Sequence, residues 1–199
     1  MQYTDYSPYA GGRALFGISG LLYFPHYISQ PHHDFLIETI DAQPWRGDLA
    51  RRTQHYGYGY DYRAKSVDPA SRVGDLPPWR QRIAVHLAAD GLMSKAPDQA
   101  IINEYAPGQG IASHIDCVPC FDDVVISRSL AAAVVMDLKQ QEHDIPILRE
   151  PRRLLVLRGE ARYQWTHGIA KRQPDSVNGT VIARERRLSV TFRNVIMTQ

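Results

Sequence analysis

Apolar residues recur at helical spacing in two segments of the first half of the chain, and each segment predicts a helix. The first segment begins near Ser29 and ends before Pro44, because proline cannot continue a helix. The second covers residues 79–92. The predicted buried stripes are Phe35, Leu36 and Ile40 in the first helix and Ile83, Leu87 and Leu92 in the second.

From about residue 100 onward the pattern changes to short apolar or alternating runs separated by turn residues, which is typical of an antiparallel sandwich or barrel. A short strand followed by a turn is also predicted in residues 15–24, after an irregular arm at 1–13. We therefore expect one domain, in which N-terminal helices and a lid (1–95) support a β-sheet core (96–199). The predicted core strands are residues 101–105, 124–129, 131–137, 145–148, 153–158, 161–167 and 187–195.

Length and composition are ordinary for a globular domain of 199 residues, with 44% hydrophobic and 22% charged residues. The sequence contains neither an apolar run long enough to cross a bilayer nor an N-terminal secretory signal. Cys117 and Cys120 are too few for a disulfide framework; their spacing matches half a zinc site or a redox pair, and we interpret them as structural or incidental. These features predict a cytoplasmic protein without membrane association.

The net charge of +2 says little about partners, but only four of the 23 basic residues are lysine. Arginine binds phosphates and carboxylates with two parallel hydrogen bonds and stacks on bases. High-GC codon usage explains an arginine excess at least as well.

A tyrosine-rich segment at residues 51–62 carries the sequence RRTQHYGYGYDY. If it is extended, Tyr56, Tyr58, Tyr60 and Tyr62 fall on one face. A row of aromatic rings beside arginine and histidine is typical of proteins that stack on unpaired bases. The alternative is a tyrosine-rich hairpin that packs against its neighbours.

Residues 103–116 contain the densest set of candidate chemical groups. In an extended chain His114 and Asp116 share a face and offer two ligands to a divalent metal. A distant histidine, His167, ends a predicted strand and can supply the third. Two histidines and one carboxylate on one side of the metal form the facial triad of non-haem Fe(II) oxygenases.

The last predicted strand carries Arg187 and Arg193 on one face. If that face points into the barrel, both guanidinium groups need an anionic partner, and a small dicarboxylate meets that need. Asn103 and Tyr105 share a face of an earlier strand. The alternative is an edge strand with its arginine face in water.

Taken in order, Asn103-x-Tyr105-x-Pro107-Gly108, His114-x-Asp116, His167-Gly168-Ile169 and Arg187-(five residues)-Arg193 resemble the AlkB family of Fe(II)/2-oxoglutarate dioxygenases over roughly residues 95–195. The resemblance implies a mainly β fold with supporting helices, a double-stranded β-helix (jelly roll) with an N-terminal nucleotide-recognition lid. It also implies O₂ as oxidant and the following roles: His114, Asp116 and His167 bind Fe(II), Asn103 and Tyr105 hydrogen-bond 2-oxoglutarate, Arg187 pairs with its distal carboxylate, and Arg193 lies beside its oxoacid end.

The motifs are most similar to the clade that contains the oxygenase domain for a modified wobble uridine in tRNA. We expect a monomer that binds nucleic acid and oxidises alkyl groups on bases, as in repair or demethylation of N-alkylated DNA or RNA. The alternatives are hydroxylation of the tRNA uridine, or oxidation of a protein or small metabolite. The chain is too short for the RNA-binding and methyltransferase domains of the tRNA enzyme, and Val118 replaces an acidic residue of the bacterial repair enzyme.

The resemblance further implies how the substrate binds. The base would be flipped or already unpaired, and stacked between His114 and a lid tyrosine, Tyr56 or Tyr58. His55 and its neighbours match the lid of the same clade. The candidate phosphate contacts are Arg51, Arg52 and Arg128.

Overall fold

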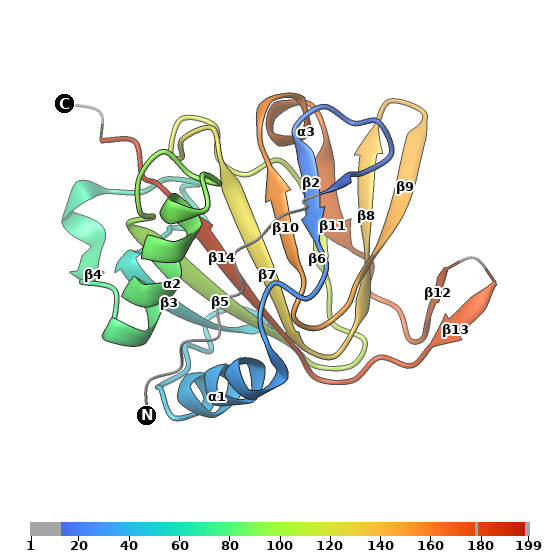
Figure 1. Cartoon of the computed structure of the whole chain (residues 1–199), viewed down its shortest axis with the longest axis horizontal. Helices are drawn as coiled ribbons and strands as arrows, with labels where there is room; N and C mark the ends of the chain where they lie inside the picture. The colour runs from blue at the N-terminus through green and yellow to red at the C-terminus, as the bar shows by residue number, and fades with distance from the viewer. Residues whose placement is uncertain (1–12, 178, 198–199) are drawn as a thin grey trace.

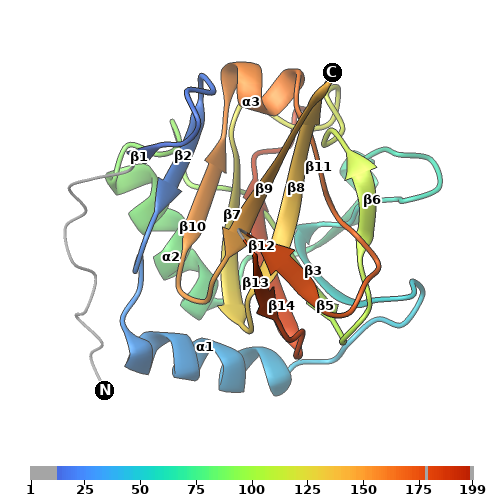
Figure 2. The same ribbon diagram turned by 90° about the vertical axis from the view of Figure 1, so that its right-hand side faces the viewer.

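A computed structural model describes residues 13–177 and 179–197, so the expected irregular arm lies outside the described residues except for Arg13. Two antiparallel sheets face each other, and two helices cover the outer face of the larger sheet (Figures 1 and 2). No helix in this described part of the chain is long and apolar enough to cross a membrane.

The larger sheet has the strand order β1-β2-β10-β7-β14-β5-β3-β4, and the smaller sheet has the order β6-β11-β8-β9. The larger sheet therefore has N-terminal strands at both of its edges. Its strands are β1 (Arg13–Ala14), β2 (Leu21–Phe24), β3 (Arg52–Tyr58), β4 (Arg72–Gly74), β5 (Gln99–Tyr105), β7 (Val125–Ala131), β10 (Leu154–Leu157) and β14 (Arg187–Arg193). The smaller sheet comprises β6 (Ile111–His114), β8 (Val134–Gln140), β9 (His143–Arg149) and β11 (Thr166–Ile169), and β12 (Asp175–Val177) pairs with β13 (Thr180–Ile182) in a separate hairpin.

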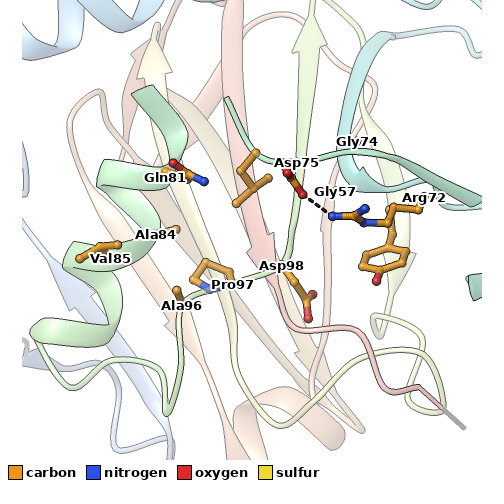
Figure 3. Close-up of a pocket in the computed structure, with 12 residues that line it drawn as sticks. Gly57, Arg72, Gly74, Asp75, Gln81, Ala84, Val85, Ala96, Pro97 and Asp98 are labelled. Carbon is orange, nitrogen blue, oxygen red and sulfur yellow. Dashed lines mark hydrogen bonds and ion pairs between the residues drawn. The ribbon is translucent and has the colours of Figure 1, made fainter. Parts of the chain in front are cut away.

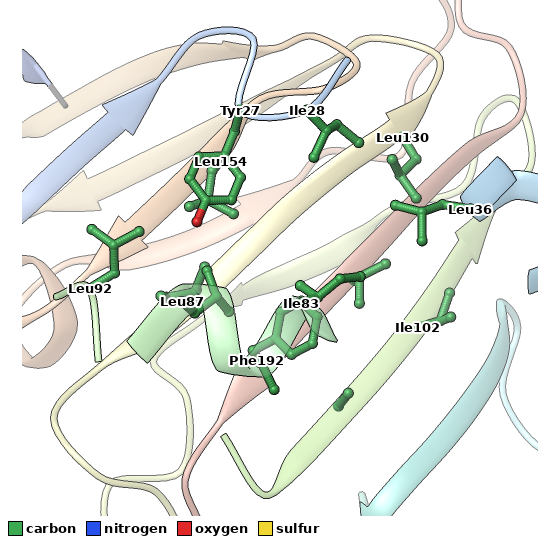
Figure 4. Close-up of a cluster of buried hydrophobic side chains, with 14 of the residues drawn as sticks. Tyr27, Ile28, Leu36, Ile83, Leu87, Leu92, Ile102, Leu130, Leu154 and Phe192 are labelled. Atoms are coloured by element: carbon green, nitrogen blue, oxygen red, sulfur yellow. The ribbon is translucent and has the colours of Figure 1, made fainter. Parts of the chain in front are cut away.

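Helices α1 (Gln30–Asp41) and α2 (Pro78–Ala89) cover the outer face of the larger sheet. Figure 4 shows their apolar side chains against strands of that sheet. In α1 the predicted stripe is wrong at Phe35, which is 36% exposed, whereas His33 is buried. The reason is tertiary: His33 Nε2 accepts a hydrogen bond from the Ala131 backbone N–H at 3.1 Å, so α1 turns this polar residue toward the end of β7.

Strand β14 lies in the larger sheet between β7 and β5, and its two faces differ as predicted. Leu188, Val190 and Phe192 pack beneath the helices. Arg187 and Arg193 face the space between the two sheets, together with Ser189 and Thr191. The alternation therefore places a polar strand face inside the molecule, and the edge-strand alternative is wrong.

Three predicted strands are wrong in part. Residues 161–167 begin as a short helix, α3 (Gly159–Tyr163), and only their end enters β11. The strand predicted at 131–137 begins at Val134, because Ala131 has φ of 64° and the chain reverses there. In residues 15–24 the turn precedes the strand, since β2 starts at Leu21.

Candidate active site

His114 and His167 lie opposite each other on β6 and β11, as a registered pair in the smaller sheet. Their ring centroids are 4.5 Å apart. Gly168 makes this approach possible, since a Cβ atom there would lie 2.8 Å from Ser113 Cα on β6. Asp116 follows two residues after β6, and its Oδ2 is 3.6 Å from His167 Nε2. The potential ligand atoms of the three residues all lie within 4.8 Å of one another.

The charge state of this cluster suits a metal. Burial alone would raise the pKa of Asp116, but Arg193, with smaller contributions from His167 and His114, lowers it to about 2. Arg193 Nη2 donates to Asp116 Oδ1 at 2.6 Å. Burial lowers the pKa of His167 to about 4, against the opposing effect of Asp116. At neutral pH the cluster therefore presents an ionised carboxylate and a neutral imidazole, the forms that bind metals.

Two further observations fit a metal to this cluster. Asp116 Oδ2 is buried and has no hydrogen-bond partner among the residues that the structure describes. His114 Nδ1 lies 2.8 Å from the Ala112 carbonyl oxygen and donates to it, so Nε2 is the nitrogen available to a ligand. Two imidazole nitrogens and one carboxylate oxygen on one side match the donor set that Fe(II) takes in facial-triad sites. The residues present therefore fit Fe(II).

Arg162, on α3, contacts the site but was not predicted from the sequence. Its Nη1 donates to the Asp116 carbonyl oxygen at 2.9 Å and its Nη2 to the Cys117 carbonyl at 3.3 Å. These bonds hold the backbone of the loop that carries Asp116. A helix was not expected in this segment, so the sequence contained no signal that Arg162 turns toward Asp116.

Arg187 lies in the same inter-sheet space and is 2% exposed. Its Nε donates to Ser129 Oγ at 3.3 Å, whereas Nη1 and Nη2 have no hydrogen-bond partner in the described part of the chain. Burial lowers the pKa of Arg187 to about 10, so the group remains cationic at neutral pH. A buried guanidinium with two unpaired nitrogens is stabilised by an anion beside it, and Arg187 lines a cavity with space for one.

The triad and Arg187 line one cavity of about 830 Å³, and Asn103, Tyr105 and Arg193 also line it. Every residue expected to bind iron or 2-oxoglutarate is thus brought to a single space. Arg51 lines it too, where its Nε donates to Asn103 Oδ1 at 2.8 Å. The guanidinium of Arg51, expected to contact phosphate, is therefore engaged inside the cavity.

The tyrosine segment does not present one face. Gly57 has φ of 77° and the register of β3 against β4 shifts beside it. A side chain could not follow this path, because a Cβ atom on Gly57 would lie 1.8 Å from the Asp98 carbonyl oxygen. As a result Tyr56 packs with the helix-side core, where its hydroxyl donates to Gln54 at 3.0 Å, while Tyr60 and Tyr62 line the cavity.

Tyr58 packs against the buried cluster of Cys120, Phe121 and Val195. The prediction that Tyr56 or Tyr58 stacks on a base in this cavity is therefore wrong, because neither lines it and the tyrosines that do are Tyr60 and Tyr62. His55 lies behind the cavity wall. Its ring lies 5.8 Å from that of Tyr62 between centroids, and its Nδ1 accepts a hydrogen bond from the Tyr60 backbone N–H at 3.4 Å. His55 thus supports the two tyrosines and is not itself part of the wall.

Two predicted phosphate contacts are also corrected. Arg128 is 0% exposed and lies over the Tyr27 ring beneath the helices, so it cannot reach a phosphate at the surface. Arg52 is paired with Glu104 and lies over Trp45, on the sheet face opposite the cavity. In both cases strand alternation directs the side chain away from the metal.

Four of the partly or fully exposed lining residues, Tyr60, Tyr62, Lys65 and Lys171, are called the mouth of the cavity here. Beside it, Cys117 and Cys120 form a disulfide with a Cα–Cα distance of 5.2 Å. A second, smaller pocket of about 380 Å³ lies between β4 and α2. Figure 3 shows residues that line it, among them Arg72 paired with Asp75.

The fold and this site define a class: the chain belongs to the 2OG-Fe(II) oxygenase superfamily, whose family model matches residues 20–193. The solved structure titled "The structure of OsALKBH1" covers 94% of this chain and is itself covered to 98%, with a TM-score of 0.62 at 15% identity. This likeness confirms the jelly-roll fold. Enzymes of this superfamily use Fe(II), 2-oxoglutarate and O₂.

Sequence relatives narrow the class. The Arabidopsis thaliana "Alkylated DNA repair protein ALKBH8 homolog" is 34% identical over 89% of this chain and 59% of its own length. The Mus musculus "tRNA (carboxymethyluridine(34)-5-O)-methyltransferase ALKBH8" is 36% identical over 88% of this chain and 30% of its own length. The chain therefore spans less than two thirds of either relative. Within the superfamily, it belongs to the AlkB family of dioxygenases.

Proposed function

We propose that the protein hydroxylates an alkyl substituent on a nucleic-acid base, with Fe(II) held by His114, Asp116 and His167. The observation that carries this proposal is the shared cavity. One space of about 830 Å³ joins the triad and Arg187 to a mouth with aromatic rings and lysines. Such a cavity has room for a dicarboxylate beside the metal and for a base at the mouth.

Co-substrate binding rests on Arg187, which would pair with the distal carboxylate of 2-oxoglutarate. Tyr105 supports this role: its side chain is buried, and burial raises the pKa of its phenol, so the hydroxyl keeps its proton and can donate. Asn103 can donate through its amide nitrogen, because its oxygen already accepts from Arg51. Arg193 would keep Asp116 ionised and correctly turned toward the metal.

When bound, the iron supplies C–H hydroxylation coupled to oxidative decarboxylation of 2-oxoglutarate by O₂ to succinate and CO₂. The protein groups hold the reactants together and exclude water. His114, Asp116 and His167 would hold the metal from one wall of the cavity, which would leave space beside it for the co-substrate. The apolar side chains of Val125, Met136 and Leu155 line the cavity and restrict solvent there.

The mouth favours an anionic or phosphate-linked base. Tyr60 and Tyr62 provide flat aromatic surfaces for stacking, and Lys65 and Lys171 provide positive charge. A carboxymethyl group on a uridine in tRNA meets both requirements, and the mouse relative is named for such a nucleoside. We therefore propose this tRNA base class first. Oxidative removal of an N-alkyl group is the second candidate, supported by the name of the Arabidopsis relative.

The test is to incubate the purified protein with Fe(II), 2-oxoglutarate and ascorbate and to measure modified nucleosides by mass spectrometry. The substrates are tRNA with carboxymethylated wobble uridine, and methylated single-stranded DNA and RNA. A mass gain of one oxygen on the uridine supports the first candidate, and loss of methyl groups from the other substrates supports the second.

His167→Ala is the matched control, because it removes one proposed metal ligand and must abolish either product. If the wild-type protein converts 2-oxoglutarate to succinate but changes none of these nucleosides, the nucleic-acid proposal is wrong. The third possibility, an oxygenase of proteins or metabolites, then takes precedence. That alternative also predicts no salt-dependent binding to oligonucleotides.

A further inference from the structure

Arg149 is a buried arginine that the proposed mechanism does not use. It is the last residue of β9, beside β8 in the smaller sheet, and it pairs with Val134. Ile147 and Arg149 are the buried residues of β9, and Ile147 packs in the inter-sheet core. The side chain of Arg149 is therefore directed between the sheets, and the residue is 0% exposed.

The guanidinium of Arg149 has an incomplete set of partners. Its Nη2 donates to the Ser127 carbonyl oxygen at 2.8 Å, and its guanidinium lies 5.7 Å from the Tyr23 ring centroid. Nε and Nη1 have no hydrogen-bond partner within residues 13–177 and 179–197. Burial lowers the pKa of Arg149 to about 9, so the group still carries its charge at neutral pH.

Arg149 lies next to the proposed co-substrate pocket. Ser127, whose carbonyl it contacts, lines the cavity, and the Ser127 hydroxyl is 3.2 Å from that of Ser189. Ser129 links it to Arg187: Ser129 Oγ accepts from Arg187 Nε and donates to the Arg149 carbonyl oxygen, both at 3.3 Å. Arg187 is also close enough for its charge to lower the pKa of Arg149.

Two buried cations thus share one region, and each has two guanidinium nitrogens without a described protein partner. The repulsion between them and the cost of desolvating them both destabilise the protein by themselves. An anion bound in front of Ser127 would offset both the repulsion between the two arginines and the cost of desolvating them. A carboxylate has two oxygens and about four acceptor sites, enough for groups from both arginines.

We propose that Arg149 is a second cationic positioning residue for the distal carboxylate of the co-substrate and makes the pocket selective for a dicarboxylate over a monocarboxylate 2-oxo acid. This inference rests on the proposed co-substrate role of Arg187. A purely structural role, in which Arg149 only ties β9 to the Ser127 carbonyl, predicts no such selectivity.

The experiment compares two ligands that differ only in the distal carboxylate, 2-oxoglutarate and 2-oxopentanoate. Their dissociation constants are measured by calorimetry on protein loaded with Mn(II), without turnover. For Arg149→Met we expect affinity for 2-oxoglutarate to fall by roughly tenfold or more, the range for losing a charge-assisted hydrogen bond. Affinity for 2-oxopentanoate should change by less than about twofold, and Arg149→Lys should recover part of the loss.

Arg153→Met is the matched control. Arg153 also lies over the Tyr23 ring at 5.7 Å but is already paired with Glu150, so its removal should leave the ratio of the two affinities unchanged. An Arg149→Met variant that loses affinity for both ligands equally would show a structural role and overturn the proposal.

A measurement on the wild-type protein does not depend on how the variants fold. In ¹⁵N NMR of arginine side chains, with Zn(II) as a diamagnetic metal, the Nε–H signal of Arg149 should shift with 2-oxoglutarate and not with 2-oxopentanoate. An Arg149 signal that responds to neither ligand contradicts the proposal. Failure of the proposed function itself is recognised separately, because Arg187→Met would then also leave 2-oxoglutarate binding unchanged.

Discussion

The metal end of the cavity, comprising His114, Asp116, His167 and Arg187, and its mouth are built from different kinds of structure. The metal end lies on or directly after paired strands, so hydrogen-bonded register sets the position of each group. Tyr60, Tyr62 and Lys65 of the mouth follow β3, beyond the register shift at Gly57. Strand pairing thus positions the proposed metal ligands, whereas a loop carries three of the four proposed substrate contacts.

The two regions also differ in solvent exposure. Asp116 and Arg187 are buried, and their pKa values are shifted, while Lys65 and Lys171 are exposed. Interactions at the metal end act in a low-dielectric interior, and those at the mouth are screened by water. Substitutions at the metal end should therefore stop the reaction, and those at the mouth should change substrate preference.

The largest effect is expected from His167→Ala. It removes one of three proposed ligands, so we expect both iron content and succinate formation to fall by more than about 100-fold. Loss of a residue that only orients a metal ligand lowers metal affinity or activity by about 10- to 100-fold, and loss of a ligand itself should exceed that range. Metal analysis and a succinate assay check this. Retention of stoichiometric iron with normal turnover would show that the cluster is not the metal site.

Arg187→Met should rank next. Truncating one member of a buried, hydrogen-bonded charge pair costs about 2–5 kcal/mol, which corresponds to a rise of roughly 30-fold or more in KM for 2-oxoglutarate. The rate at saturating co-substrate should change much less, because the metal ligands are untouched. Steady-state kinetics at varied 2-oxoglutarate concentration separate KM from the rate at saturation. An unchanged KM would show that the distal carboxylate does not bind at Arg187.

At the mouth, Tyr62→Ala should lower kcat/KM for the nucleic-acid substrate by roughly tenfold, since base–aromatic stacking contributes about 1–3 kcal/mol. KM for 2-oxoglutarate should stay near the wild-type value. Tyr56→Phe is the control, because it removes only a hydroxyl on the opposite sheet face. If Tyr56→Phe lowers kcat/KM for the nucleic-acid substrate as much as Tyr62→Ala does, the assignment of Tyr56 and Tyr62 to opposite faces of the sheet is wrong.

The smallest expected effect is on the pH dependence of the free energy of unfolding, which compares one histidine from each region. Burial lowers the pKa to about 4 for one histidine in each region, His167 at the metal end and His55 behind the mouth. The unfolded chain protonates both near pH 6.5, whereas the folded protein does not. The unfolded state therefore gains protons first as the pH falls, and the free energy of unfolding of the metal-free protein should decrease from about pH 6.5 toward 4.

Urea denaturation across this pH range provides the measurement. His167→Gln and His55→Gln should each make the decrease shallower, since each removes one titrating group. A variant with the wild-type slope would indicate that the corresponding histidine titrates normally in the folded protein.

Much of the metal end could be predicted from sequence because it depends on local alternation. Arg187 and Arg193 are six residues apart in one strand, and Asn103 and Tyr105 are two apart in its neighbour, so each pair must share a face. The order and spacing of these motifs were sufficient to identify the AlkB family. No periodicity, however, shows which face of a strand will be covered by the second sheet.

Tertiary structure decided the rest. The close approach of Gly57 to the Asp98 carbonyl interrupts the alternation, so Tyr56 packs with the core while Tyr60 and Tyr62 reach the cavity. Arg128 was expected to contact phosphate, and no role was predicted for Arg149, but both are completely buried. The sequence by itself determined which residues share a strand face and which motifs occur. Contacts between segments far apart in the chain determined which face became interior, because burial depends on what packs against a residue and not on its neighbours in sequence.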